Sequence, residues 1–369
     1  MMTVRDFWLR DGMGRLEDKS NNFTAMRILF ALMVLYAHAL IIPQGLPYVG
    51  AWQVTADFLV NCALDGFFIL SGYMITASAM KSTSLTGYAA SRIFRIYPGL
   101  IASVIVVMVA TMFFTSLPAA EYWTHRETWL FPVKLLTQAD PLAGLPGAFE
   151  GLPTAYRANA PLWTIRFELL AYLGVGLLLA AGLYKHKLLV LFWALAACAG
   201  GALVIQFGYS GPGDDTIQTL SRFAPAFMIG AAFHAGRAHL RLSPALIVLT
   251  LAAALASSHL AIGGIMKDVF LAALFIWMGH RHIPGRTGEA VRNVEDISYG
   301  IYILHWPLGQ MLAVSLPTMN TTLLALAMFL AVLPVAWLMR VLVESPSLVL
   351  KSKLFPRKRV DVTKAAVPA

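Results

Sequence analysis

Two ionisable side chains, Arg27 and His38, lie in the first long apolar stretch of the chain, RILFALMVLYAH. In a helix, this spacing brings them to within about 20° of one face and about 16 Å apart along the axis. Ala31 and Val34 lie on the same stripe. An ionisable residue in a membrane span indicates a functional site, because its burial costs about 2.5–3.5 kcal/mol. The alternative is that Arg27 reaches lipid headgroups and His38 makes an interhelical hydrogen bond.

Two carboxyl groups interrupt later apolar stretches. Asp65 lies in LDGFFILSGYMIT and Glu168 in PLWTIRFELLAYL. If these stretches cross a bilayer, both groups lie at the depth of His38, where mutual pairing makes burial tolerable. We therefore expect His38, Asp65 and Glu168 to form one polar layer. The alternative is a structural cluster, although such clusters more often use Ser, Thr and Asn.

A second set of charges is expected on the cytoplasmic side. Arg92 and Arg95, in SRIFRIYP, precede the third predicted span, and Arg340 and Glu344, in RVLVESP, close the tenth. With Arg27 they predict an electropositive patch suited to phosphate groups. The alternative for Arg92 and Arg95 is the ordinary excess of basic residues in cytoplasmic loops.

The segment SYGIYILHWPL places Ser298, Tyr302 and His305 on one helical face and predicts a kink at Pro307. His305 is as readily explained by a structural role as by a functional one.

The elements that position these residues are membrane helices. Of the 369 residues, 58% are hydrophobic and 13% are charged, whereas soluble domains have about a quarter charged. The apolar residues form blocks of about twenty, which span a hydrocarbon core of roughly 30 Å as helices. The pattern argues against an outer-membrane barrel. The net charge of +9 is spread in short clusters between the blocks, as in membrane proteins, so nucleic acid is not an expected partner.

We expect an all-α, multi-pass membrane protein with about ten transmembrane helices and both termini cytoplasmic, because every second loop is basic. No cleavable signal peptide is predicted in residues 1–20. Cys62 and Cys198 lie inside predicted spans and offer neither a disulfide framework nor a zinc site. The predicted spans are 25–43, 57–80, 98–117, 161–184, 188–207, 221–236, 243–259, 265–280, 297–315 and 321–343.

In order along the chain, these segments resemble acyltransferase family 3, a family of membrane-bound O-acyltransferases. Arg27 and His38 resemble its Arg-x10-His pair. DGFFILSGYMIT is similar to its Asp-x-Phe-Phe-x-x-Ser-Gly block, SRIFRIYP to its Arg-x-x-Arg-x-x-Pro block and PLWTIRFELLAY to its Leu-Trp-Ser…Glu segment. SYGIYILHWP resembles its Ser-Tyr…Tyr-x-x-His-x-Pro segment and VESP its terminal Glu-x-Pro, so that the resemblance covers about residues 20–348.

The sequence departs from this family at two positions. Thr164 stands where Ser is common, and Arg166 interrupts a stretch that is usually apolar or small. We therefore carry no catalytic role to Thr164.

The resemblance implies transfer of an acyl group, usually acetyl from acetyl-CoA, to a hydroxyl of a surface or lipid-linked glycan such as an exopolysaccharide or O-antigen, at the cytoplasmic (inner) membrane. Acyl-CoA would be bound through its phosphates, and its pantetheine arm would follow the stripe from Arg27 to His38. His38 would act as general base or transient acyl carrier, with Asp65 or Glu168 orienting its imidazole. No metal is expected. The residues assigned to acyl-CoA are Arg27, Arg92 and Arg95; candidate supporting residues are Ser71, Trp163, Tyr302, His305 and Glu344.

The expected organisation is a cytoplasmic N-terminal segment (1–24), a transmembrane acyltransferase domain (25–348) and a cytoplasmic tail (349–369). The loop 118–160 is expected to be extracytoplasmic, with Trp123 and Trp129 contacting sugar or lying at the membrane interface. The expected partners are the bilayer, acyl-CoA and a glycan acceptor. The alternatives are a secondary transporter or flippase with an intramembrane His/carboxylate relay, and a catalytically inactive scaffold in a glycan complex.

Overall fold

The computed structural model describes residues 21–45, 50–82, 84–155 and 157–356. Within these ranges the chain is helical, and the only extended pairing is one bridge between Thr115 and Ala148. The predicted all-α fold is therefore confirmed. The predictions for the N-terminal segment up to residue 20 and for the tail from residue 357 lie outside the described residues.

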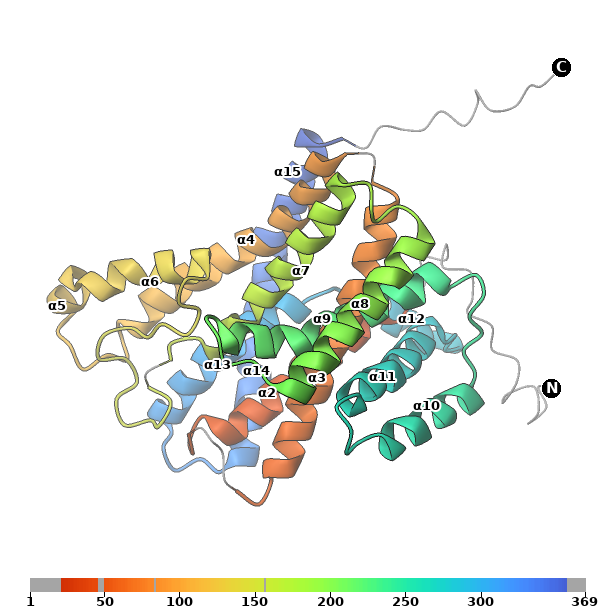
Figure 1. Ribbon diagram of the computed structural model, residues 1–369. Helices are drawn as coiled ribbons and strands as arrows, with labels where there is room; N and C mark the ends of the chain where they lie inside the picture. Colours follow the sequence, from red (N-terminus) through yellow and green to blue (C-terminus); the bar gives the residue numbers. More distant parts are fainter. Residues whose placement is uncertain (1–20, 46–49, 83, 156, 357–369) are drawn as a thin grey trace.

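The helices lie side by side in one bundle, with α5 and α6 at one edge next to α4 and with α10 and α11 at the other (Figure 1). The α-helices are α2 (Phe23–Ile41), α3 (Gln53–Met80), α4 (Leu85–Thr111), α5 (Ala119–Thr124), α6 (Arg126–Thr137), α7 (Trp163–Ala180), α8 (Lys187–Phe207), α9 (Asp214–Gly236), α10 (Pro244–Ala256), α11 (Gly263–His280), α12 (Gly285–Asn293), α13 (Ser298–Ser315), α14 (Thr321–Met339) and α15 (Ser345–Leu354). A 3-10 turn, η1 (Ala160–Leu162), precedes α7, and a π-helical turn, η2 (Arg340–Glu344), joins α14 to α15.

Six helical segments of the described chain are long and apolar enough to cross a membrane: α2, α3, α4, η1 with α7, α8, and the run from α14 through α15. A helix also occupies each of the other predicted spans, although α10 has only 13 residues. The chain is thus a multi-pass helical membrane protein by length and composition. The number of ten crossings and the cytoplasmic position of the termini stay predictions.

The helix that contains the third predicted span begins well before residue 98. Helix α4 begins at Leu85, after Ser84, whose side chain accepts a hydrogen bond from the backbone N–H of Gly87. Pro98 does not interrupt the helix, although it cannot donate to the carbonyl of Phe94. The Ser347 hydroxyl donates to that carbonyl at 3.1 Å instead. The two arginines at 92 and 95 therefore lie within helix α4 and not in the loop before it.

The close crossing of α3 and α9 depends on two glycines. A Cβ added to Gly72 would lie 1.8 Å from the carbonyl oxygen of Phe227, and one added to Gly230 would lie 2.0 Å from that of Ile69. Small residues that let two backbones approach are a common basis of helix packing in membranes. Helix α9 also begins at Asp214, seven residues before the predicted span.

Part of the loop 118–160 is helical and is held against the bundle. The Tyr122 hydroxyl donates to the carbonyl of Met108 at 2.8 Å, which fixes α5 to the end of α4. The Arg166 guanidinium donates to the carbonyl of Gln138 at 2.6 Å, which fixes the end of α6 to α7. Gln138 has a φ of 59° and ends α6 in the left-handed region. Arg166, the departure from the family pattern, thus positions this loop.

Candidate functional site

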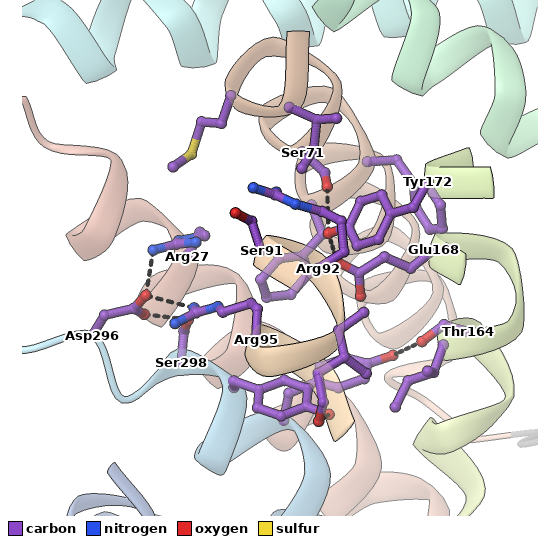
Figure 2. A pocket seen from close by; sticks show the side chains of 18 of the residues that line it. Arg27, Ser71, Ser91, Arg92, Arg95, Thr164, Glu168, Tyr172, Asp296 and Ser298 are labelled. Atoms are coloured by element: carbon purple, nitrogen blue, oxygen red, sulfur yellow. Dashed lines mark hydrogen bonds and ion pairs between the residues drawn. The ribbon is translucent and has the colours of Figure 1, made fainter. Parts of the chain in front are cut away.

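A cavity of about 430 Å³, lined by apolar and charged side chains, lies inside the bundle between α2, α3, α4, α7 and α13 (Figure 2). This volume is within the range of about 300–1,000 Å³ that is usual for small-molecule sites. Four cationic side chains and two carboxylates line it, so that its net charge is positive. The charged lining residues are Arg27, Arg92, Arg95, Lys351, Glu168 and Asp296.

Two of the arginines share one carboxylate. Arg27 and Arg95 both contact the same oxygen of Asp296, the second at 2.7 Å, and the Ser298 hydroxyl donates to the other oxygen at 2.7 Å (Figure 2). Arg95 also lies 3.6 Å from the buried carboxylate of Glu344. Burial alone would raise the pKa of Asp296, but the two guanidinium charges outweigh it and hold this pKa at about 2. Asp296 therefore carries a negative charge throughout the physiological range.

Arg92 is held differently. Its guanidinium lies 5.9 Å from the ring centre of Tyr88 and 5.6 Å from that of Tyr172, which are cation–π distances. Its nearest polar partner is the Ser78 hydroxyl at 3.5 Å, and no described carboxylate forms an ion pair with it. Arg92 is therefore the arginine of this cavity whose charge is least compensated.

Glu168 lines the same cavity, and its hydrogen-bond partner is Tyr172 and not His38. Its carboxylate accepts a hydrogen bond from the Tyr172 hydroxyl, which is also 3.3 Å from the hydroxyl of Ser71 (Figure 2). Glu168 thus belongs with the arginines rather than with the imidazole.

Asp65 lies in a third, separate cluster. It is fully buried, and its two oxygens lie 2.7 Å from Arg222 of α9 and 2.6 Å from Lys267 of α11. The expected pairing of His38 with Asp65 and Glu168 is therefore wrong. Residues at one depth can face different neighbours, and two basic residues of α9 and α11 neutralise Asp65.

The partner of His38 is His305. The Nδ1 atom of His38 lies 2.7 Å from the Nε2 atom of His305, and the two ring planes differ by 8°. Since 2.7 Å is a hydrogen-bond distance and too short for stacked rings, the imidazoles meet edge to edge. His38 is partly exposed and His305 is fully buried. Trp306 packs perpendicular to His38, with ring centres 4.9 Å apart.

The proline of α13 joins the loop to this pair. Pro307 cannot donate to the carbonyl of Ile303. The side chain of Asn159 donates to that carbonyl at 2.8 Å. The indole of Trp306 donates to the carbonyl of Arg157 at 3.1 Å. Residues 157–159 therefore lie against the middle of α13, next to His305.

One aromatic layer separates the cavity from the histidine pair. Tyr302 lines the cavity, and its hydroxyl lies 2.7 Å from that of Thr164. Its ring centre is 5.6 Å from that of Phe67 and 6.1 Å from that of His305.

The stripe of α2 that was expected to carry the pantetheine arm is closed, because Ala31 and Val34 are buried. The open space follows α3, α4 and α7 instead.

The remaining predicted residues have structural contacts. Trp163 packs on Phe167 and Phe223, and Arg340 pairs with Glu295 at 3.4 Å outside the cavity lining. Asp296 was not predicted. Its signal is a carboxylate two residues before the start of α13, with Ser298 two residues after it in the motif DIS.

Fold and site together define a helical membrane protein with a cationic internal cavity that ends near a pair of imidazoles. A family model described as an acyltransferase domain matches residues 20–341. The chain belongs to this acyltransferase family. No solved structure matches it significantly.

Two curated relatives are similar to part of the chain. Nodulation protein 10 of Rhizobium leguminosarum bv. viciae is 29% identical over 165 residues, which are 43% of this chain and 44% of the relative. An O-acetyl transferase of Shigella phage Sf6 is 28% identical over 165 residues, which are 44% of this chain and 46% of the relative. The chain thus matches less than half the length of either relative.

Proposed function

We propose that the protein is an integral membrane O-acyltransferase that moves an acetyl group from acetyl-CoA to a hydroxyl of a surface or lipid-linked glycan, in the cytoplasmic membrane. The observation that carries the proposal is the cavity itself, which has a net positive charge and ends at Tyr302, whose ring centre lies 6.1 Å from that of His305. Family membership and the similarity to an O-acetyl transferase support the reaction type.

The donor end of the site is the cluster of arginines. Guanidinium groups bind phosphates through paired hydrogen bonds, and Arg92 has no competing carboxylate among the described residues. Arg27 and Arg95 are held in place by Asp296. We therefore assign Arg92 to direct phosphate contact. Arg27 and Arg95, already held by Asp296, supply further positive charge on the side of the cavity that binds the phosphates. The acyl arm then extends along the cavity towards Thr164 and Tyr302, and the thioester reaches His38 once the Tyr302 side chain turns aside.

The chemical step uses His38 as general base. The imidazole takes the proton of the acceptor hydroxyl while the hydroxyl oxygen bonds to the thioester carbonyl carbon. The carbon–sulfur bond then breaks, and the CoA thiolate leaves with the proton that His38 returns. The products are the acylated glycan and CoA.

The test is acylation of the natural glycan. A deletion strain of the source organism is complemented with wild type, with His38→Ala or with His259→Ala, and its surface glycans are analysed by mass spectrometry. Loss of a positioned base lowers the rate by about 10²–10⁴-fold, so His38→Ala should leave the glycan unacylated. His259 is exposed and outside the site, so His259→Ala should restore acylation. Full acylation by a well-expressed His38→Ala protein would refute the proposal.

A further inference from the structure

We infer that His305 is a positioning residue that fixes His38 in a single tautomer, with the proton on Nδ1 and the reactive lone pair on Nε2. The inference rests on the proposed function, because it names the nitrogen of His38 that takes the hydroxyl proton. It follows from a chain of two hydrogen bonds that ends at a backbone carbonyl.

The chain begins at the buried end. The Nδ1 atom of His305 lies 3.0 Å from the carbonyl oxygen of Ile301. A carbonyl oxygen only accepts hydrogen bonds, so this nitrogen must carry the proton. In a neutral imidazole the other nitrogen is then an acceptor. The Nε2 atom of His305 therefore presents a lone pair towards His38.

The same reasoning determines the tautomer of His38. The Nδ1 atom of His38 lies 2.7 Å from this lone pair, so Nδ1 must donate. The lone pair of His38 is thereby left on Nε2, to which no described residue makes a hydrogen bond. His38 is partly exposed, whereas His305 is fully buried. The geometry therefore assigns the reactive nitrogen to the accessible ring.

The surroundings keep His305 in place. It lies on α13 between Tyr302, whose hydroxyl bonds Thr164, and Trp306, whose indole bonds the carbonyl of Arg157. Asn159 holds the carbonyl of Ile303, which Pro307 leaves free. All three partners lie in residues 157–164, and the contacts of Arg157 and Asn159 do not depend on the Tyr302 side chain, so the ring of His305 is oriented before any substrate binds.

The arrangement also accommodates the reaction. When Nε2 of His38 takes the hydroxyl proton, the ring becomes a cation that still donates through Nδ1 to His305. The positive charge can be shared along this hydrogen bond, because His305 Nε2 can accept the Nδ1 proton while its own Nδ1–H stays on Ile301. Return of a proton from His38 Nε2 to the CoA thiolate restores both neutral rings. In serine proteases a carboxylate has the equivalent place, and there loss of the correct tautomer lowers kcat by about 10⁴-fold.

The first experiment compares His305→Gln with His305→Leu, using purified protein, acetyl-CoA and glycan isolated from the deletion strain. A glutamine side-chain oxygen can accept the Nδ1 proton of His38, whereas leucine cannot. We expect His305→Leu to lower kcat at least ~10-fold with an unchanged Kd for CoA, because His305 does not line the cavity. His305→Gln should recover much of kcat. Equal kcat in the two variants, with both proteins folded and binding CoA, would overturn the inference.

The second experiment tests the reactive nitrogen directly, in a His305→Ala background that makes room beside Nδ1 of His38. His38 is replaced by histidine methylated on Nε2 or on Nδ1, through an expanded genetic code. Methylation of Nε2 should abolish the transfer that remains in His305→Ala, and methylation of Nδ1 should leave that residual turnover measurable. The reverse order would overturn the assignment while leaving the proposed function standing, whereas full activity of both methylated proteins would refute the role of His38 itself.

Discussion

Replacement of Asp296 by Asn tests whether the shared carboxylate holds the donor side of the cavity together. Asp296 is 13% exposed, and its two arginine partners are 20% and 25% exposed. Its pKa is about 2 compared with an ordinary value of 3.8. At 1.36 kcal/mol per pH unit, this difference corresponds to about 2.5 kcal/mol of folding stability. Asp296→Asn should therefore lower the free energy of unfolding by about that amount.

The neighbouring carboxylate supplies a matched control. Glu295 is 70% exposed and pairs with Arg340 at 3.4 Å. Exposed ion pairs contribute about 0–1 kcal/mol, so Glu295→Gln should change stability little. Thermal unfolding in detergent, followed by tryptophan fluorescence, should show a midpoint lower by on the order of 5 °C for Asp296→Asn and near the wild type for Glu295→Gln.

The pH dependence gives an independent check of this assignment. Folding lowers the pKa of Asp296. The stability that the charged carboxylate adds to the folded protein is therefore complete above about pH 4 and is lost as the pH falls towards 2. The difference between wild type and Asp296→Asn should thus be the same at pH 5 and pH 8. An Asp296→Asn protein as stable as Glu295→Gln would refute the argument that the two arginines are held by this charge.

Three further predictions concern separate parts of the molecule. Arg92→Ala should weaken CoA binding by about 10–100-fold in calorimetry, since bonds to charged groups contribute about 1.5–3 kcal/mol, and the exposed Arg241→Ala should not. Gly72→Ala should destabilise the protein by at least 1–3 kcal/mol, whereas Gly174→Ala, which meets nothing within 4 Å, should not. Trp129 is 59% exposed. If it lies at the membrane interface, Trp129→Ala should change neither CoA binding nor glycan transfer, whereas a fall in transfer alone would identify a sugar contact.

The sequence was sufficient for the helices and for part of the cavity. Helical length and apolar composition depend on local residues, so a helix occurs in each predicted span. The grouping of Arg27, Arg92 and Arg95 was also predictable, since all three lie at the same end of their helices, and they do line one cavity. The boundary of α4 was not predictable from Pro98, because the carbonyl that this proline leaves free is bound by Ser347 on a distant part of the chain.

The pairing of polar residues between different helices could not be predicted from the sequence. Depth in the bilayer can be inferred from the position of a residue along a span, but the neighbour that it faces depends on how all the helices pack. His38 and His305 are 267 residues apart, and they meet because α2 and α13 are neighbours in the bundle. Asp296, close to α13, joins arginines of α2 and α4 in the same way.

The position of Asp65 shows why a family motif does not by itself identify a catalytic group. A fully buried carboxylate needs compensation, and Arg222 and Lys267 provide it at 2.7 and 2.6 Å. These contacts join α3 to α9 and α11, and the crossing of α3 with α9 also relies on Gly72 and Gly230. Removal of one partner from such a buried pair is strongly destabilising, because it leaves an uncompensated charge. Loss of activity on mutation of Asp65 would therefore reflect the packing of three helices, and the orientation of His38 is explained by His305 without it.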